Sequence, residues 1–119
     1  AIRIGAPVSF DKAVAALRAT DGVVRSVGEE ELAEEAAQAD RRGLFVCPHT
    51  AVALAAHRQL REEGVIDAGD RCVVVSTAAG LKFPEFKVRY HEGAGREANR
   101  PVECEATVDA VREAVARAL

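Results

Sequence analysis

Segments with helical periodicity alternate along this chain with short runs rich in apolar, β-branched residues. Apolar and small residues at helical spacing predict helices over about residues 10–20, 29–42 and 50–63, and from about residue 107 onward. The valine-rich runs 23–27 and 72–75 are predicted strands, and 44–47 is a short apolar entry to the third helix. This alternation favours an α/β fold, a parallel sheet with flanking helices.

The run 72–75 is followed by two hydroxyl residues, Ser76 and Thr77, and then by Ala78, Ala79 and Gly80. A short β-branched run is typical of a central parallel strand, and ligands of open α/β sheets bind where such strands end. Small side chains leave space for a flat ligand, and the hydroxyls offer directional hydrogen bonds. The same residues also suit a tight turn with a hydroxyl cap, and both interpretations stay open at this point.

Composition narrows the class of protein. A chain of 119 residues provides about one domain, and 49% hydrophobic with 4% aromatic residues indicates an aliphatic, alanine-rich core. The net charge of −3 argues against a nucleic-acid or anionic-membrane partner.

No run approaches the roughly 20 apolar residues of a membrane span. The three cysteines are too widely spaced for a disulfide framework or a zinc site, so a reducing, cytoplasmic location is expected.

Two sequence blocks indicate a family. The first, 43–56, contains Cys47-Pro48-His49-Thr50, and the second, 70–83, contains the apolar run with Ser76 and Thr77. In this order and at this separation they resemble the C-terminal part of threonine synthase, a pyridoxal-phosphate enzyme of the tryptophan-synthase-β-like fold. The resemblance extends over most of the chain. It implies that residues 1–119 are an incomplete, C-terminal portion of the large cofactor-binding domain, and the absence of methionine also suggests a processed or truncated product.

The resemblance implies a lyase of threonine biosynthesis that converts O-phosphohomoserine and water to threonine and phosphate with pyridoxal 5'-phosphate. Carried over by motif, the Thr77 hydroxyl would meet the pyridine nitrogen of the cofactor, with Ser76 as the competing candidate. A neutral hydroxyl suits a neutral ring nitrogen, whereas an aspartate would keep it protonated. Cys47, His49 and Thr50 would lie near the ring, although Thr50 could be only a helix cap and His49 only a polar residue bonded to backbone. Cys47 lacks an evident activating neighbour, so a nucleophilic role is not expected.

Several parts of such an enzyme are not found in this sequence. None of Lys12, Lys82 and Lys87 resembles the lysine that binds the cofactor, and no glycine-rich phosphate loop is visible. The chain alone is therefore expected to be inactive and to need the missing N-terminal portion as a partner. Exposed apolar surface would also favour a homo-oligomer. Ala79 stands where the family usually has histidine, which puts catalytic competence in question.

Other functions stay open. Threonine dehydratase and cysteate synthase are related enzymes of the same fold, but the Cys47-Pro48-His49-Thr50 block favours threonine synthase over them. A hypothesis of a different class is a non-catalytic α/β module that binds or interacts with another molecule.

Overall fold

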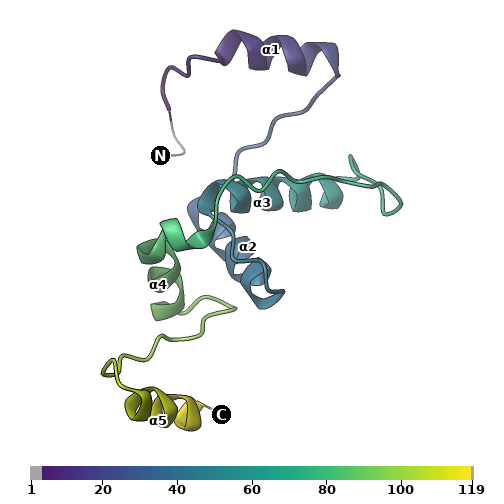
Figure 1. Ribbon diagram of the computed structural model, residues 1–119. Helices are drawn as coiled ribbons and strands as arrows, with labels where there is room; N and C mark the ends of the chain where they lie inside the picture. Colours follow the sequence, from purple (N-terminus) through teal and green to yellow (C-terminus); the bar gives the residue numbers. More distant parts are fainter. Residues whose placement is uncertain (1–3, 119) are drawn as a thin grey trace.

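The structure is a computed structural model that describes residues 4–118. Its elements, in chain order, are α1 (Phe10–Ala19), α2 (Glu29–Arg41), α3 (Pro48–Glu62), the 3-10 turn η1 (Gly80–Lys82), α4 (Pro84–Glu92) and α5 (Val108–Ala118). Helices α2, α3 and α4 lie together in the centre, whereas α1 and α5 lie apart from them at opposite ends (Figure 1). The central helices therefore form the packed part of the described chain.

The sequence sets the ends of the two longest helices. α2 begins with three glutamates, 29–31, whose negative charge is favourable at a helix N-terminus. α3 begins at Pro48, in the first turn, where proline removes no intrahelical hydrogen bond. Gly43 and Gly64 follow the two helices with φ of 82° and 71°, the left-handed conformation in which glycine commonly stops a helix.

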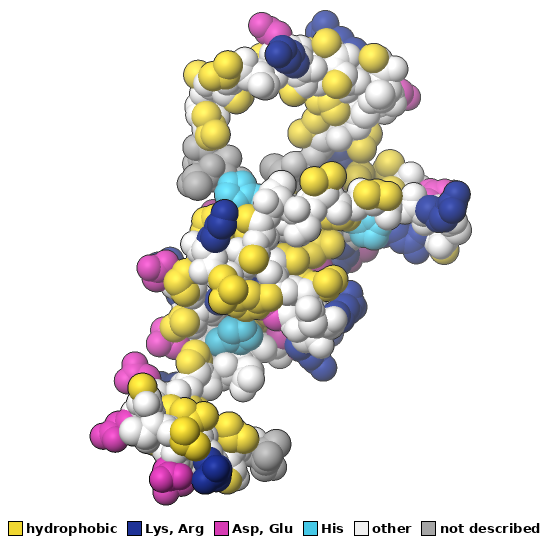
Figure 2. Space-filling model, in the orientation of Figure 1, with side chains coloured by type: hydrophobic (Ala, Val, Ile, Leu, Met, Phe, Trp, Pro, Cys, Tyr) yellow, Lys and Arg dark blue, Asp and Glu magenta, His cyan; other side chains and the backbone are white. Residues whose placement is uncertain are grey.

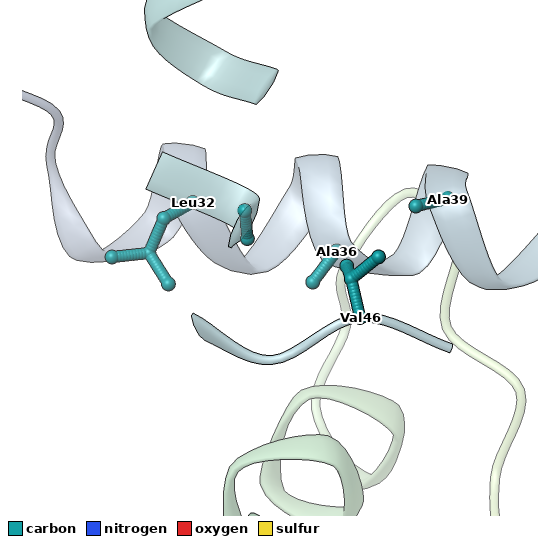
Figure 3. Packing of buried hydrophobic residues seen from close by; sticks show 5 residues of the cluster. Leu32, Ala36, Ala39 and Val46 are labelled. Carbon is teal, nitrogen blue, oxygen red and sulfur yellow. The ribbon is translucent and has the colours of Figure 1, made fainter. Parts of the chain in front are cut away.

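The core forms where α2 packs on α3. Leu32, Ala36 and Ala39 recur at helical spacing on one face of α2 and are buried against Ala51 of α3 and Val46 of the preceding segment. Figure 3 shows these side chains converging from α2 and from the segment at Val46. The alanines allow the two helices to approach closely, so the core is small and aliphatic.

Outside this core the chain is extended and largely exposed to solvent. The described part of α1 and of α5 contains no buried residue, and Figure 2 shows hydrophobic side chains at the surface of both. The radius of gyration is 17.9 Å, whereas a compact domain of this length would have about 13.5 Å. The accessible surface is 9401 Å², against about 6,200 Å² for a compact monomer of this size.

The predicted parallel sheet is wrong. Among residues 4–118 there is no strand, and the elements are helical. The backbone pairing outside helices is an isolated antiparallel bridge between Val46 and Ala79. A strand is held by hydrogen bonds to a neighbouring strand, and the runs 23–27 and 72–75 have no such neighbour in the described chain. Val73 is 92% and Val75 73% exposed, which is the opposite of a central strand buried on both faces.

The helices themselves were largely predictable. Each helix predicted from the sequence is present, with ends shifted by a few residues. The sequence interpretation left α4 unassigned, although Pro84 directly after Phe83 is a recognisable helix start. This omission matters because α4 carries a buried lysine.

Candidate functional site

Two segments cross at the amino end of α3 and form the candidate site. The amide of Cys47 donates to the carbonyl of Ala78 at 3.2 Å, and the amide of Gly80 donates to the carbonyl of Phe45 at 2.9 Å. These bonds flank the bridge between Val46 and Ala79. Residues 43–46 and 76–79 line a hollow of about 440 Å³ at this crossing. Ser76 and Thr77 thus line an open surface hollow rather than a crevice at the end of a sheet.

A thiol and three hydroxyls gather beside the hollow. The Sγ atom of Cys47 lies 3.4 Å from Oγ1 of Thr50 and 3.3 Å from Oγ1 of Thr77. The Thr50 hydroxyl accepts a hydrogen bond from the Thr77 amide at 3.2 Å, and it lies 3.5 Å from Oγ of Ser76. Cys47 and Thr50 are buried, whereas Ser76 and Thr77 are exposed. The buried pair therefore fixes the exposed pair at the edge of the hollow.

The thiol of Cys47 is acidified in this setting. Burial alone raises the pKa of a thiol. Hydrogen bonds from the side chains of Thr50 and Thr77, from the backbone of Thr50 and from His49 act in the opposite direction and lower the Cys47 pKa from 9.0 to about 6. Each of these bonds stabilises the thiolate, which accepts hydrogen bonds better than the neutral thiol. Cys47 therefore has the activating neighbours that were not evident in the sequence.

The contacts of His49 and Thr50 differ from those that the simpler roles, a polar residue bonded to backbone and a helix cap, would give them. The N-cap of α3 is Cys47, so Thr50 lies inside the first turn and is not the cap. Its hydroxyl is bonded to the segment 76–77 instead. The His49 ring lies 5.9 Å, centre to centre, from the ring of Phe83 and is also a hydrogen-bond partner of Cys47. The structure thus brings Cys47, Thr50, Ser76 and Thr77 together, whereas His49 lines a separate hollow beside Phe83.

The lining of the hollow is compatible with one face of a planar nitrogen heterocycle. No charged side chain belongs to residues 43–46 and 76–79, which line it. The polar side chains there are the hydroxyls of Ser76 and Thr77, each able to donate or accept a hydrogen bond. A neutral ring nitrogen needs a neutral donor, and a hydroxyl is one. The residues therefore fit the pyridine side of pyridoxal phosphate, but they include neither a lysine nor a cradle for its phosphate.

The sequence interpretation missed the ion pair behind the site. Lys87 of α4 is buried and donates to both carboxylate oxygens of Asp40 in α2, each at 2.8 Å. From the sequence, Lys87 does not resemble a cofactor lysine, and no other role is predicted for it. The Pro84 helix start would have placed it on a helix, but no sequence pattern pairs it with a residue so distant along the chain.

Among residues 4–118, no cluster of histidine, cysteine, aspartate and glutamate is arranged to hold a metal ion. Within the same part of the chain, every helix is too short or too polar to cross a bilayer.

The chain is similar to several curated proteins, although no family model matches it. It is 52% identical over 118 residues, 95% of the chain, to Threonine synthase 2, chloroplastic, of Arabidopsis thaliana. It is 40% identical over 93 residues, 77% of the chain, to Threonine synthase of Methanocaldococcus jannaschii. It is 36% identical over 116 residues, 97% of the chain, to Threonine synthase of Methanosarcina acetivorans.

These matches cover a limited part of each relative. The chain spans 23% of the Arabidopsis and Methanocaldococcus proteins and 27% of the Methanosarcina protein, about a quarter of their length. The similarity includes nearly the whole chain and so both sequence blocks that form the hollow. The resemblance noted from those blocks is thus supported: along nearly its whole length, this chain is similar to proteins named threonine synthase.

Proposed function

We propose that this chain supplies the pyridine-side wall of the pyridoxal 5'-phosphate site in a threonine synthase. The observation that carries the proposal is the hollow at the crossing of two segments, where Ser76 and Thr77 present neutral hydroxyls among small and apolar residues. The 52% identity to the Arabidopsis threonine synthase over this region supports the same function. The reaction would be the conversion of O-phosphohomoserine and water to threonine and phosphate.

Within this site Thr77 would bind the ring nitrogen. Its backbone amide is bonded to Thr50 Oγ1, and its own Oγ1 lies against the Cys47 sulfur. These two contacts restrict the rotation of the side chain. The hydroxyl has a single proton, so with the cofactor bound Cys47 would be the neutral thiol that donates to Thr77 Oγ1, and the Thr77 proton would go to the ring nitrogen. Ser76 is the second candidate, because its hydroxyl also lines the hollow and makes a longer contact, 3.5 Å, with Thr50.

The cofactor, when bound, would supply an electron sink for a carbanion next to the amino group of the substrate. A ring nitrogen that meets a hydroxyl stays neutral, which makes it a weaker sink than one protonated by a carboxylate. Cys47 and Thr50 would hold the Thr77 side chain in place. The covalent lysine, the phosphate site and the substrate contacts would come from the other three quarters of a protein of the relatives' length. A complete enzyme of this kind would be a homo-oligomer.

A hybrid protein tests this proposal. In it, the present chain replaces the matching segment of the Arabidopsis relative, with which it shares 52% identity. The expected result is phosphate release from O-phosphohomoserine that depends on added pyridoxal 5'-phosphate. The unaltered Arabidopsis protein is the positive control, and the hybrid without cofactor is the negative one. A folded hybrid that binds the cofactor but releases no phosphate would contradict the proposed reaction, and Ala79→His would then show whether the missing histidine is responsible.

A further inference from the structure

Lys87 is a buried cation with one anionic partner. The residue lies on α4 with 6% of its surface exposed, and its Nζ atom donates to both carboxylate oxygens of Asp40 at 2.8 Å. The Asp40 side chain, on α2, is 16% exposed. Lysines are rarely buried to this degree unless they are paired. The ion pair therefore links α4 to α2 through the interior of the described chain.

The Lys87 side chain also lies directly against the crossing that forms the hollow. Its Nζ atom lies 4.7 Å from the centre of the Phe45 ring, a distance at which a cation is attracted to an aromatic face. A Cβ atom added at Gly80 would lie 2.9 Å from the Lys87 Cε atom, and equally close to Phe45 Cδ1 and the Val46 carbonyl oxygen. The lysine stem, the Phe45 ring and the Gly80 backbone are thus packed without space between them.

Both segments of the crossing depend on this packing. Gly80 donates its amide to Phe45, and Cys47 donates its amide to Ala78, so residues 45–47 and 78–80 are joined at the place that Lys87 covers. Ser76 and Thr77 directly precede the second segment. If Lys87 were released from Asp40, the crossing would lose the support behind Phe45 and Gly80.

We propose that the Lys87–Asp40 ion pair positions the hydroxyls of Ser76 and Thr77 by holding residues 78–80 against residues 45–47. Both members are positioning residues, because neither lines the hollow. This inference rests on the proposed function only in naming the ligand of these hydroxyls, and the positioning itself does not depend on it.

An ion pair suits this task because its hydrogen bonds are directional. An apolar contact at the same place would tolerate sliding of α4 along α2, whereas two charge-assisted bonds fix one arrangement. A buried ion pair is a weak source of stability, since desolvation of both charges offsets their attraction. A role in fixing geometry accounts better for the pair than a role in stability alone.

The test uses the whole chain with Cys72→Ser and Cys104→Ser, so that Cys47 is the only thiol. Cys47 is fully buried, and its reaction with a chromogenic disulfide reagent reports how often the crossing opens. Lys87→Met keeps the stem and removes the charge. Its expected effects are a rise of at least about tenfold in the reaction rate of Cys47 and shifted amide resonances of Ser76 and Thr77. Lys87→Arg keeps a cation that can bind both Asp40 oxygens, and it should restore most of the protection.

Two controls separate positioning from stability. Arg58→Met, made together with Glu35→Gln so that no buried carboxylate is left unpaired, removes another cation that links α3 to α2 away from the crossing. It should leave the Cys47 rate within about twofold of the parent. If Lys87→Met does not fold, as judged by circular dichroism, the neutral pair Lys87→Met with Asp40→Asn replaces it, because that variant leaves no unpaired charge buried.

An unchanged Cys47 rate with unshifted Ser76 and Thr77 resonances would overturn the inference. So would an equal rise in Arg58→Met with Glu35→Gln, or no recovery in Lys87→Arg. None of these measurements uses the cofactor or the substrate. A failure of the proposed threonine synthase function would therefore leave this result standing, and a failure here would leave that function untouched.

Discussion

Titration of the Cys47 thiol links the hydroxyl cluster to the stability of the fold. In the folded chain the Cys47 pKa is lowered from 9.0 to about 6. Because the folded value lies below the unfolded one, the thiolate adds stability that is complete above pH 9.0 and is lost as the pH falls through about 6. Three pKa units correspond to about 4 kcal/mol of unfolding free energy across this window.

The experiment uses the chain with Cys72→Ser and Cys104→Ser, so that the ultraviolet absorbance of the thiolate reports Cys47 alone. The absorbance should rise with a midpoint near the folded pKa of about 6. Urea unfolding at several pH values between the two pKa values should show an unfolding free energy that increases by about 1.4 kcal/mol for each pH unit. In Cys47→Ser this slope should largely disappear, because serine does not ionise in that range.

The neighbours of the thiol provide the remaining controls. Thr50→Val and Thr77→Val each remove a bond to the sulfur and should raise the Cys47 pKa. His49→Gln removes the titratable group that contacts the sulfur, so a midpoint that persists in this variant belongs to Cys47. Lys87 and Asp40 are the charged groups packed behind the crossing, and they are paired with each other. A midpoint at or above the ordinary value of 9.0 would refute the reasoning, since burial would then outweigh the hydrogen bonds.

Two further predictions concern packing. Gly80→Ala should destabilise the crossing by roughly 1–3 kcal/mol, because the added Cβ would lie 2.9 Å from the Val46 carbonyl oxygen. The control Gly28→Ala should have a much smaller effect, because a Cβ added at Gly28 meets no atom within 4 Å. Urea denaturation and Cys47 reactivity measure both, and equal effects would contradict the close packing at Gly80. Leu32→Ala should cost about 2–5 kcal/mol because Leu32, 3% exposed, is the largest side chain of the α2 core. A loss below about 1 kcal/mol in urea denaturation would show that the core tolerates a cavity there.

The helices were predictable because their signals are local. Glu29–31 at the start of α2, Gly43 after it and Pro48 at the start of α3 act within a few residues of the positions they define. The sheet was not predictable in the same way. An apolar run such as 72–75 becomes a strand only if another segment pairs with it, and pairing is a property of the whole fold. In the described chain that partner does not exist.

The candidate site was partly predictable. The small residues and hydroxyls at 76–79 predicted a ligand crevice at the end of a strand, and the block at 47–50 predicted a second part of the same site. The strand is absent from the described residues, but the two segments meet at one hollow. Their contact through Cys47, Thr50 and Thr77 is an outcome of the fold. The acidified thiol was missed because its cause is the convergence of hydroxyls from distant positions. The roles of Asp40 and Lys87 were missed for the same reason.

The affinity of the hybrid protein for pyridoxal 5'-phosphate, measured with Thr77→Val, tests the account most directly. Valine has nearly the shape of threonine but lacks the hydroxyl. If Thr77 binds the ring nitrogen, the Kd should rise by about fivefold to 150-fold, since an unsatisfied polar group costs about 1–3 kcal/mol. Thr77→Ser should stay close to the parent, and Ser76→Ala should change the Kd by no more than about twofold. An unchanged Kd in Thr77→Val, or a larger effect in Ser76→Ala, would contradict the assignment of Thr77 to the pyridine nitrogen.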